Sequence, residues 1–185
     1  MADFSFHDVG SAPQESKPLL EFGLKAYGRI PVMYAAMAEA PGLLDSYIKV
    51  QDLFMASSFT KEEMTVVWQA INVEHECHYC VPGHSFMARS MGVDASLDAA
   101  LRAEMPLPTP RLEALRSFTL AMLRQRGAVS DAQVDAFLAA GFTRRNVYEV
   151  ILGLAQKVMS NFTNHIAKTP VTGDLENFTW SRGGP

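Results

Sequence analysis

Both cysteines of the chain and three of its five histidines lie in one short stretch. Glu74–Arg89 has the sequence Glu-His-Glu-Cys-His-Tyr-Cys-Val-Pro-Gly-His-Ser-Phe-Met-Ala-Arg. At about 100° per residue of an α-helix, Cys77, Cys80 and His84 fall within an arc of about 60°. Glu74 lies about 60° from Cys77 on the same side. Two thiols, a base and a carboxylate would then share one helix face.

This combination of side chains is suited to reversible thiol oxidation. An i, i+3 spacing can bring two cysteine Cα atoms within the roughly 4.4–6.8 Å that a disulfide tolerates. The thiolate is the reacting form, so a neighbouring base or a positive helix dipole must lower the cysteine pKa. His84 is within reach of Cys80 as a proton acceptor or relay, and Glu74 can orient an imidazole or pass a proton on. The catalytic candidates are therefore Cys80, Cys77, His84 and Glu74.

Two other interpretations of the same residues stay open. Cys77, Cys80, His84 and either His78 or Glu74 would make four ligands for a zinc ion, although the chain has no second Cys-x-x-Cys pair. Both thiols could also be inert core residues. The alternatives to a thiol-dependent enzyme are therefore a metal-binding or redox-sensing oligomeric module, or another small-molecule enzyme on the same scaffold.

The bulk properties exclude several classes of protein. The 185 residues fit one domain, and a net charge of -4 provides no basic surface for nucleic acid. The first residues, Met-Ala-Asp-Phe-Ser-Phe-His-Asp, lack the basic start of a signal peptide, and no apolar run reaches the roughly 18 residues of a membrane span. We expect a cytoplasmic protein without nucleic-acid or membrane partners. In that reducing compartment a close cysteine pair indicates redox chemistry or a metal more than a structural disulfide.

The rest of the chain predicts an all-α fold that positions this stretch. No segment shows sustained strand alternation, whereas apolar residues recur at three- and four-residue steps. Residues 1–16 are polar and predict an N-terminal arm, and residues 17–185 predict a single helical domain. A break near Glu76 would place the cysteines at a helix N-terminus, where the dipole favours a thiolate. The predicted helices cover about residues 18–29, 31–39, 43–57, 60–76, 77–90, 96–103, 111–126, 131–141 and 143–168.

Two of these helices begin alike. Phe59-Thr60-Lys61 and Phe142-Thr143-Arg144 superpose without gaps along the chain, which places Cys77 over Ser160 and Cys80 over Thr163. We interpret this match as an internal duplication in which one copy keeps the thiols.

The cysteine stretch resembles the carboxymuconolactone decarboxylase and alkylhydroperoxidase D-like (AhpD-like) superfamily. Residues 77–84, Cys-His-Tyr-Cys-Val-Pro-Gly-His, are similar to its Cys-x-x-Cys-x-x-x-His signature, and Asn-x-x-Asn-His at residues 161–165 supports the match. The resemblance covers about residues 20–170. It implies an AhpD-like helical bundle, assembly into dimers, trimers or hexamers, and a thiol peroxidase activity that needs no metal or cofactor.

The resemblance also implies a role for each residue of the signature. Cys80 would attack a small-molecule hydroperoxide, Cys77 would resolve the product into a disulfide, and His84 would belong to the proton relay. An external dithiol or protein reductant would supply electrons. The relay glutamate of the peroxidase members lies twelve residues before the first cysteine, where this chain has Thr65, and their second relay histidine is Tyr79 here.

Overall fold

The computed structural model describes residues 4–184, and within this range the chain forms helices and no strands. The all-α prediction is confirmed. The α-helices alternate with short turns, and two 3₁₀-helices, η1 and η2, lie near the ends of the described chain. The elements are η1 Gln14–Ser16, α1 Lys17–Tyr27, α2 Val32–Met37, α3 Pro41–Met55, α4 Lys61–Glu74, α5 Cys80–Ser90, α6 Ala95–Arg102, α7 Pro110–Arg124, α8 Asp131–Ala139, α9 Arg144–Ala167 and η2 Gly173–Phe178.

Side-chain capping boxes define the starts of α4, α8 and α9. Thr60 before α4, Ser130 before α8 and Thr143 before α9 each accept a hydrogen bond from the backbone N–H three residues later. In each case the side chain of that later residue accepts a hydrogen bond from the backbone N–H of the capping residue, which completes a capping box. Each box provides partners for helix N–H groups that the helix itself cannot pair.

Two predicted boundaries were wrong. The helix after the first Pro-Gly pair begins at Pro41 and not after it, because proline is favourable in a first helical turn. The cysteine helix begins at Cys80 and not at Cys77. The break near Glu76 is confirmed, since Glu76 has a φ of 53° and turns the chain between α4 and α5.

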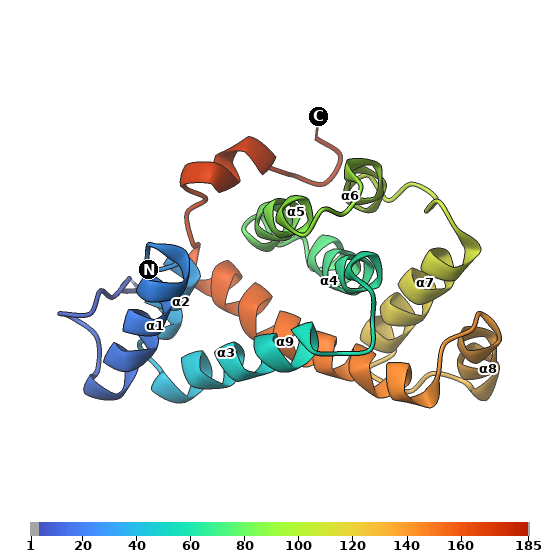
Figure 1. Ribbon diagram of the computed structural model, residues 1–185, viewed down its shortest axis with the longest axis horizontal. Coiled ribbons are helices and arrows are strands. Elements are labelled where there is room, and N and C mark those ends of the chain that lie inside the picture. The colour runs from blue at the N-terminus through green and yellow to red at the C-terminus, as the bar shows by residue number, and fades with distance from the viewer. Residues whose placement is uncertain (1–3, 185) are drawn as a thin grey trace.

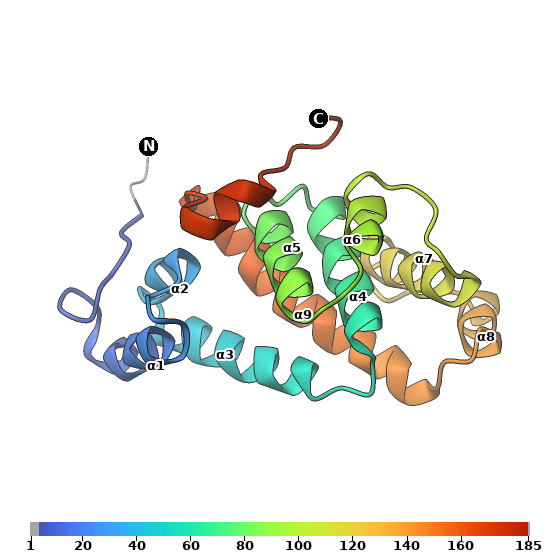
Figure 2. The same cartoon turned by 45° about the horizontal axis from the view of Figure 1, so that its top comes forward.

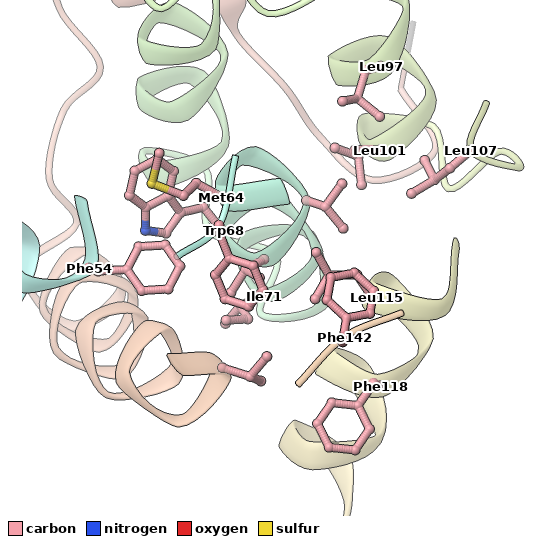
Figure 3. Close-up of a cluster of buried hydrophobic side chains, with 14 of the residues drawn as sticks. Phe54, Met64, Trp68, Ile71, Leu97, Leu101, Leu107, Leu115, Phe118 and Phe142 are labelled. Atoms are coloured by element: carbon pink, nitrogen blue, oxygen red, sulfur yellow. The ribbon is translucent and has the colours of Figure 1, made fainter. Parts of the chain in front are cut away.

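Helix α4 occupies the centre of the molecule. It contacts α5, α6, α7 and α9, and the long α9 runs beneath it, with α1 and α2 near one end of α9 and α7 and α8 at the other (Figures 1 and 2). The larger hydrophobic core surrounds α4, where the rings of Phe54 and Trp68 pack 5.1 Å apart (Figure 3). Nearly every α4 residue is buried. The centre of the fold is therefore the helix that leads directly into the cysteines.

A second core cluster contains both cysteines. It joins them to buried side chains of α1, α2 and α3 and to Leu175 of η2. Figure 1 shows η2 and the chain that follows it crossing over α5 towards α6. The rings of Phe86 and Phe178 contact each other edge to face, and Trp180 donates a hydrogen bond to the carbonyl of Arg102. The sequence did not predict this C-terminal segment, which lies over the cysteine helix.

The N-terminal segment lies along α2. The backbone N–H of His7 donates to the carbonyl of Ala35, and the Ser16 hydroxyl donates to the carbonyl of Ala38. The limits predicted for the arm at 1–16 and the domain at 17–185 stay predictions, and residues 1–3 and 185 lie outside the described residues. Over residues 4–184, none of the helices combines the length and the apolarity that crossing a bilayer requires.

One face of α9 exposes apolar side chains at steps of three, four or seven residues. Tyr148, Ile151, Val158, Phe162 and Ile166 are between 36% and 71% exposed. The opposite face of the same helix is buried against α3 and α4. Helix α9 therefore combines an inner face that lies beneath the cysteines with an outer apolar stripe.

Candidate active site

The two cysteines lie where α4 ends and α5 begins. The N–H of Cys77 donates to the carbonyl of Asn72, which closes the end of α4, and Cys80 is the first residue of α5. The backbone N–H of Cys80 points at Cys77 Sγ, 3.3 Å away. Both thiols are free and buried. The turn therefore brings the pair together, as the sequence predicted, without Cys77 being helical.

Cys80 has the environment of a thiolate. Asn164 of α9 donates a hydrogen bond from Nδ2 to Cys80 Sγ at 3.1 Å. Burial alone would raise the pKa of Cys80, but the hydrogen bond from Cys77, the charge of Lys157 and the Asn164 amide together lower it to about 6. Cys80 is thereby the ionised member of the pair at neutral pH.

Cys77 has the opposite character. Its hydrogen bond to Cys80, its burial and the negative charge of Cys80 all raise the pKa of Cys77. The pair therefore holds a thiol next to a thiolate. Thiol–disulfide chemistry needs this arrangement, because the thiolate of one cysteine is the nucleophile while the other cysteine stays a protonated thiol.

Lys157 is a functional candidate that sequence reasoning missed. It lies in the middle of α9, is fully buried, and places Nζ 2.5 Å from His84 Nε2 of α5. Burial lowers the pKa of Lys157, while the charges of Cys80 and Cys77 act to raise it. Burial and the neighbouring Lys157 hold the pKa of His84 well below its usual value. His84 also packs against the ring of Trp68, at 4.8 Å between ring centroids.

A sequence signal for Lys157 does exist. The buried face of α9 carries polar side chains at helical spacing, where a helix of a globular core normally carries apolar ones. Such a stripe indicates a polar network or a site facing the protein interior. Its members are Asn146, Glu149, Gln156, Lys157, Ser160, Asn161 and Asn164.

A cavity of about 590 Å³ opens beside Cys80. Cys80, His84 and Lys157 line it, whereas Cys77 is not among its lining residues. Its walls are mainly aromatic and aliphatic side chains of the α1–α2 connection, α2, α3, α5 and η2. The aromatic members are Tyr27, Tyr34, Tyr47, Tyr79 and Phe86. A volume of this size accommodates an organic molecule, and its walls favour an apolar one.

The structure does not bring Glu74 to the thiols. Its carboxylate forms a two-bond ion pair with Arg124 of α7, at 2.6 and 2.7 Å, and lies 3.9 Å from Arg182. The hydrogen bond and charge of Arg124 lower the pKa of Glu74. Because α4 ends at Glu74 and the chain then turns, the helix face that was expected to hold Glu74 and Cys77 together does not exist. Glu74 instead connects α4 to α7 and to the C-terminal segment.

The two positions that differ from the resemblance have structural explanations. Thr65 is buried and donates its hydroxyl to the carbonyl of Lys61 in its own helix, so it offers no proton to the cysteines. Tyr79 lines the cavity.

Over residues 4–184, no three His, Cys, Asp or Glu side chains are grouped so that they could hold a metal ion. The four-ligand zinc arrangement considered from the sequence is therefore not assembled.

Comparison with solved structures places this geometry in a known fold. A peroxidase-related protein with an alkylhydroperoxidase AhpD core from Ralstonia eutropha JMP134 superposes with a TM-score of 0.78 at 18% identity, over 95% of this chain and 96% of that one. The chain has the AhpD-like fold. A peroxidase-related protein from Silicibacter sp. TM1040 shares this fold, with a TM-score of 0.71 at 19% identity over 91% of this chain and 88% of the other.

The AhpD-like fold also includes a protein with a different named activity. A cysteine-to-alanine variant of the debrominase Bmp8, in complex with 2,3,4-tribromopyrrole, superposes with a TM-score of 0.77 at 14% identity, over 96% of this chain and 95% of that one. No protein-family model and no curated protein matches the sequence. At these identities the likeness establishes the AhpD-like fold, and the chemistry must be argued from the site itself.

Proposed function

We propose that this protein is a thiol peroxidase that reduces organic hydroperoxides with the Cys80 and Cys77 pair. The observation that supports this proposal most directly is the position of Cys80. It is a thiol with a pKa lowered to about 6, it lines a cavity of about 590 Å³, and Cys77 lies directly beside it as a protonated thiol. Only Cys80 of the two lines the cavity, which favours Cys80 as the attacking sulfur.

The reaction proceeds in two steps. The Cys80 thiolate attacks one oxygen of the hydroperoxide, so that an S–O bond forms, the O–O bond breaks and the alcohol leaves after gaining a proton. Cys80 is then a sulfenic acid. Cys77 attacks this sulfur, a disulfide forms, and the hydroxyl leaves as water with the Cys77 proton. An external dithiol or protein reductant returns both cysteines to the reduced state.

The cavity walls support an organic substrate over hydrogen peroxide. Tyr34 and Met33 from α2, Tyr47 from α3 and Phe86 from α5 give the cavity a largely apolar lining. Burial raises the pKa of Tyr34 and of Tyr47, so both phenols are neutral and protonated under ordinary conditions. An apolar group on the hydroperoxide would displace water from these walls, which contributes binding free energy that hydrogen peroxide cannot provide.

The proposal is tested by following hydroperoxide consumption with dithiothreitol as the reductant. We expect turnover of cumene hydroperoxide to exceed that of hydrogen peroxide in the wild type, and we expect none in Cys80→Ser. Cys77→Ser should form a sulfenic acid at Cys80 that dimedone labels, detected by mass spectrometry. Equal consumption of cumene hydroperoxide by wild type and Cys80→Ser would overturn the proposal.

A second candidate function is thiol-dependent removal of a halogen from an aromatic ring. The likeness to Bmp8 and the aromatic walls of the cavity favour it. In this reaction the aryl halide gains hydrogen and releases halide, while Cys80 and Cys77 are oxidised to the disulfide. The test is release of bromide from 2,3,4-tribromopyrrole by the reduced protein, with Cys80→Ser as control. Bromide release without consumption of cumene hydroperoxide would favour this second function.

A further inference from the structure

Lys157 is an unusual residue for a protein core. Its side chain is completely buried, and among residues 4–184 it forms no salt bridge with a carboxylate. Its ammonium group instead lies at hydrogen-bond distance from His84 Nε2. Buried lysines are rare and normally paired, because taking an unpaired charge out of water costs several kcal/mol. The site must therefore contain something that compensates for this burial.

The negative charge of the Cys80 thiolate favours the ammonium form of Lys157. Lys157 and Asn164 lie two turns apart on the inner face of α9, and Asn164 is hydrogen bonded to Cys80 Sγ. Lys157, His84 and Cys80 all line the same cavity. The titratable groups around the ammonium are Cys77 and Cys80 from the α4–α5 turn and the start of α5 and His84 from α5, with Tyr34 and Tyr47 in the cavity wall from α2 and α3. Tyr27, Arg29, Tyr79 and Asp174 line the same cavity.

We propose that Lys157 is the charge partner of the Cys80 thiolate and the acid that protonates the leaving alcohol during hydroperoxide reduction. This proposal rests on the proposed function and extends it, because it identifies the proton donor of the reaction. Among the described residues, no carboxylate or histidine is hydrogen bonded to either thiol, and Thr65 occupies the position of the relay glutamate that the resemblance leads one to expect. Two cationic side chains, Arg29 and Lys157, line the cavity together with Cys80. Lys157 is the one whose charge acts on Cys80, and a guanidinium holds its protons too tightly to serve as an acid.

The proton and electron balance is complete. Before reaction Cys80 is a thiolate, Lys157 an ammonium and Cys77 a thiol. When the S–O bond forms and the O–O bond breaks, the electron pair goes to the alkoxide oxygen, which takes a proton from Lys157. The products of the oxidative half-reaction, in which the hydroperoxide oxidises both cysteines, are the alcohol, water, the Cys77–Cys80 disulfide and a neutral Lys157 amine. Reduction by the external dithiol regenerates the thiolate, and the amine regains a proton from solvent.

Burial makes this proton transfer favourable at the correct moment. While the thiolate is present, its negative charge stabilises the ammonium. Once Cys80 is oxidised that charge is gone, and a buried amine without a counter-charge favours its neutral form. Oxidation of the Cys80 thiolate therefore favours transfer of the Lys157 proton to the leaving alkoxide.

His84 acts through Lys157 and not on sulfur. With its pKa held well below the usual value, the imidazole is neutral and its Nε2 accepts a hydrogen bond from the ammonium. The ring is fixed by its contact with Trp68. His84 is thus a positioning residue that orients the Lys157 N–H groups in the cavity.

The test separates the charge of Lys157 from its ability to donate a proton. Lys157→Met removes both, whereas Lys157→Arg keeps the charge but holds its proton too tightly to serve as an acid. Lys157→Met is expected to fold, since replacing a buried charge by an apolar chain is often neutral or stabilising. Lys49→Met, at an exposed lysine paired with Asp45, is the matched control for loss of one positive charge. Circular dichroism checks folding of each variant.

The first readout does not need a peroxide. Alkylation of Cys80 by iodoacetamide is followed by peptide mass spectrometry between pH 5 and pH 9. The wild type and Lys49→Met should show a midpoint near the lowered pKa of about 6. Lys157→Met should shift the midpoint upward by at least about one pH unit, which is a fall of about fivefold in the alkylation rate at pH 6. Lys157→Arg should stay near the wild-type midpoint.

The second readout is the rate of Cys80 oxidation by hydroperoxides whose leaving alcohols differ in acidity. We expect a weak dependence on the alcohol pKa in wild type and a steep dependence in both Lys157 variants, because neither supplies a proton. An unchanged alkylation midpoint in Lys157→Met would overturn the charge role, and an unchanged dependence in Lys157→Arg would overturn the proton role. If wild-type Cys80 alkylates with the expected midpoint but does not react with hydroperoxides, the proposed function fails while the charge role stands.

Discussion

Replacing Gly153 by alanine should weaken the packing that places the centre of α9 beneath the active site. A Cβ built at Gly153 would lie 2.8 Å from Phe54 Cε2 and 2.8 Å from Val67 Cγ1, well inside the roughly 3.5–4.0 Å of a normal carbon contact. Phe54 and Val67 are both fully buried, and the Phe54 ring is held against Trp68. Neither can therefore move into free space.

The magnitude follows from two opposing effects. Inserting a methyl group into a well-packed core typically costs about 1–3 kcal/mol. Alanine in place of glycine inside a helix returns up to about 1 kcal/mol. With two close contacts the cost should be near the upper end, so we expect Gly153→Ala to lose about 1–2 kcal/mol. For a chain of this length that loss lowers Tm by about 2–8 °C.

Thermal unfolding followed by circular dichroism measures this effect. Gly42→Ala is the matched control, because Gly42 is an exposed α3 residue whose added Cβ would meet no atom within 4 Å. The control should keep or slightly raise Tm. A Tm for Gly153→Ala equal to or above that of the wild type would show that α9 does not pack as closely as described and would refute the reasoning.

Three further predictions concern the site and its surroundings. Glu74→Gln should lower the free energy of unfolding, measured by chemical denaturation, by no more than about 1 kcal/mol, because the carboxylate pairs with Arg124 on a partly exposed surface. Hydroperoxide turnover should stay within about twofold of wild type. A loss of turnover with unchanged stability would show that Glu74 is a catalytic residue. Asn164→Leu removes the amide that donates a hydrogen bond to Cys80. Because a hydrogen bond to a charged group contributes about 1.5–3 kcal/mol, the pH midpoint of Cys80 alkylation should rise by about one to two units. An unchanged midpoint would contradict that. Ile166→Asp on the exposed stripe of α9 should convert the expected homo-oligomer to monomer in gel filtration, whereas a wild type that elutes as a monomer would contradict self-association through this face.

The features that the sequence predicted well are local ones. The helix start at Thr60 and the break near Glu76 depend on residues within a few positions of each other. For the same reason the proximity of Cys77 and Cys80 could be expected, since a three-residue spacing at a helix start leaves few alternatives. The AhpD-like fold was likewise inferred from a local signature, and its helices follow from apolar periodicity.

The features that the sequence did not predict depend on distant partners. Glu74 appeared close to Cys77 on a continuous helix, but its actual partner, Arg124, is fifty residues away along the chain. Lys157 escaped notice because its role depends on His84, seventy-three residues earlier, and on complete burial. The polar residues of α9 recur at helical spacing, but a helix of a globular protein normally turns such a face to solvent, and tertiary packing shows that α9 turns it inward.

The most direct test of the central claim is a free-thiol titration of the fully reduced protein before and after one equivalent of cumene hydroperoxide, without any reductant. Wild type and Cys80→Ser are compared in parallel. The proposed chemistry predicts rapid loss of both thiols in wild type, formation of the Cys77–Cys80 disulfide and no loss of the remaining thiol in the variant. Persistence of both thiols in wild type, or equal thiol loss in Cys80→Ser, would contradict the assignment of Cys80 as the sulfur that attacks the hydroperoxide.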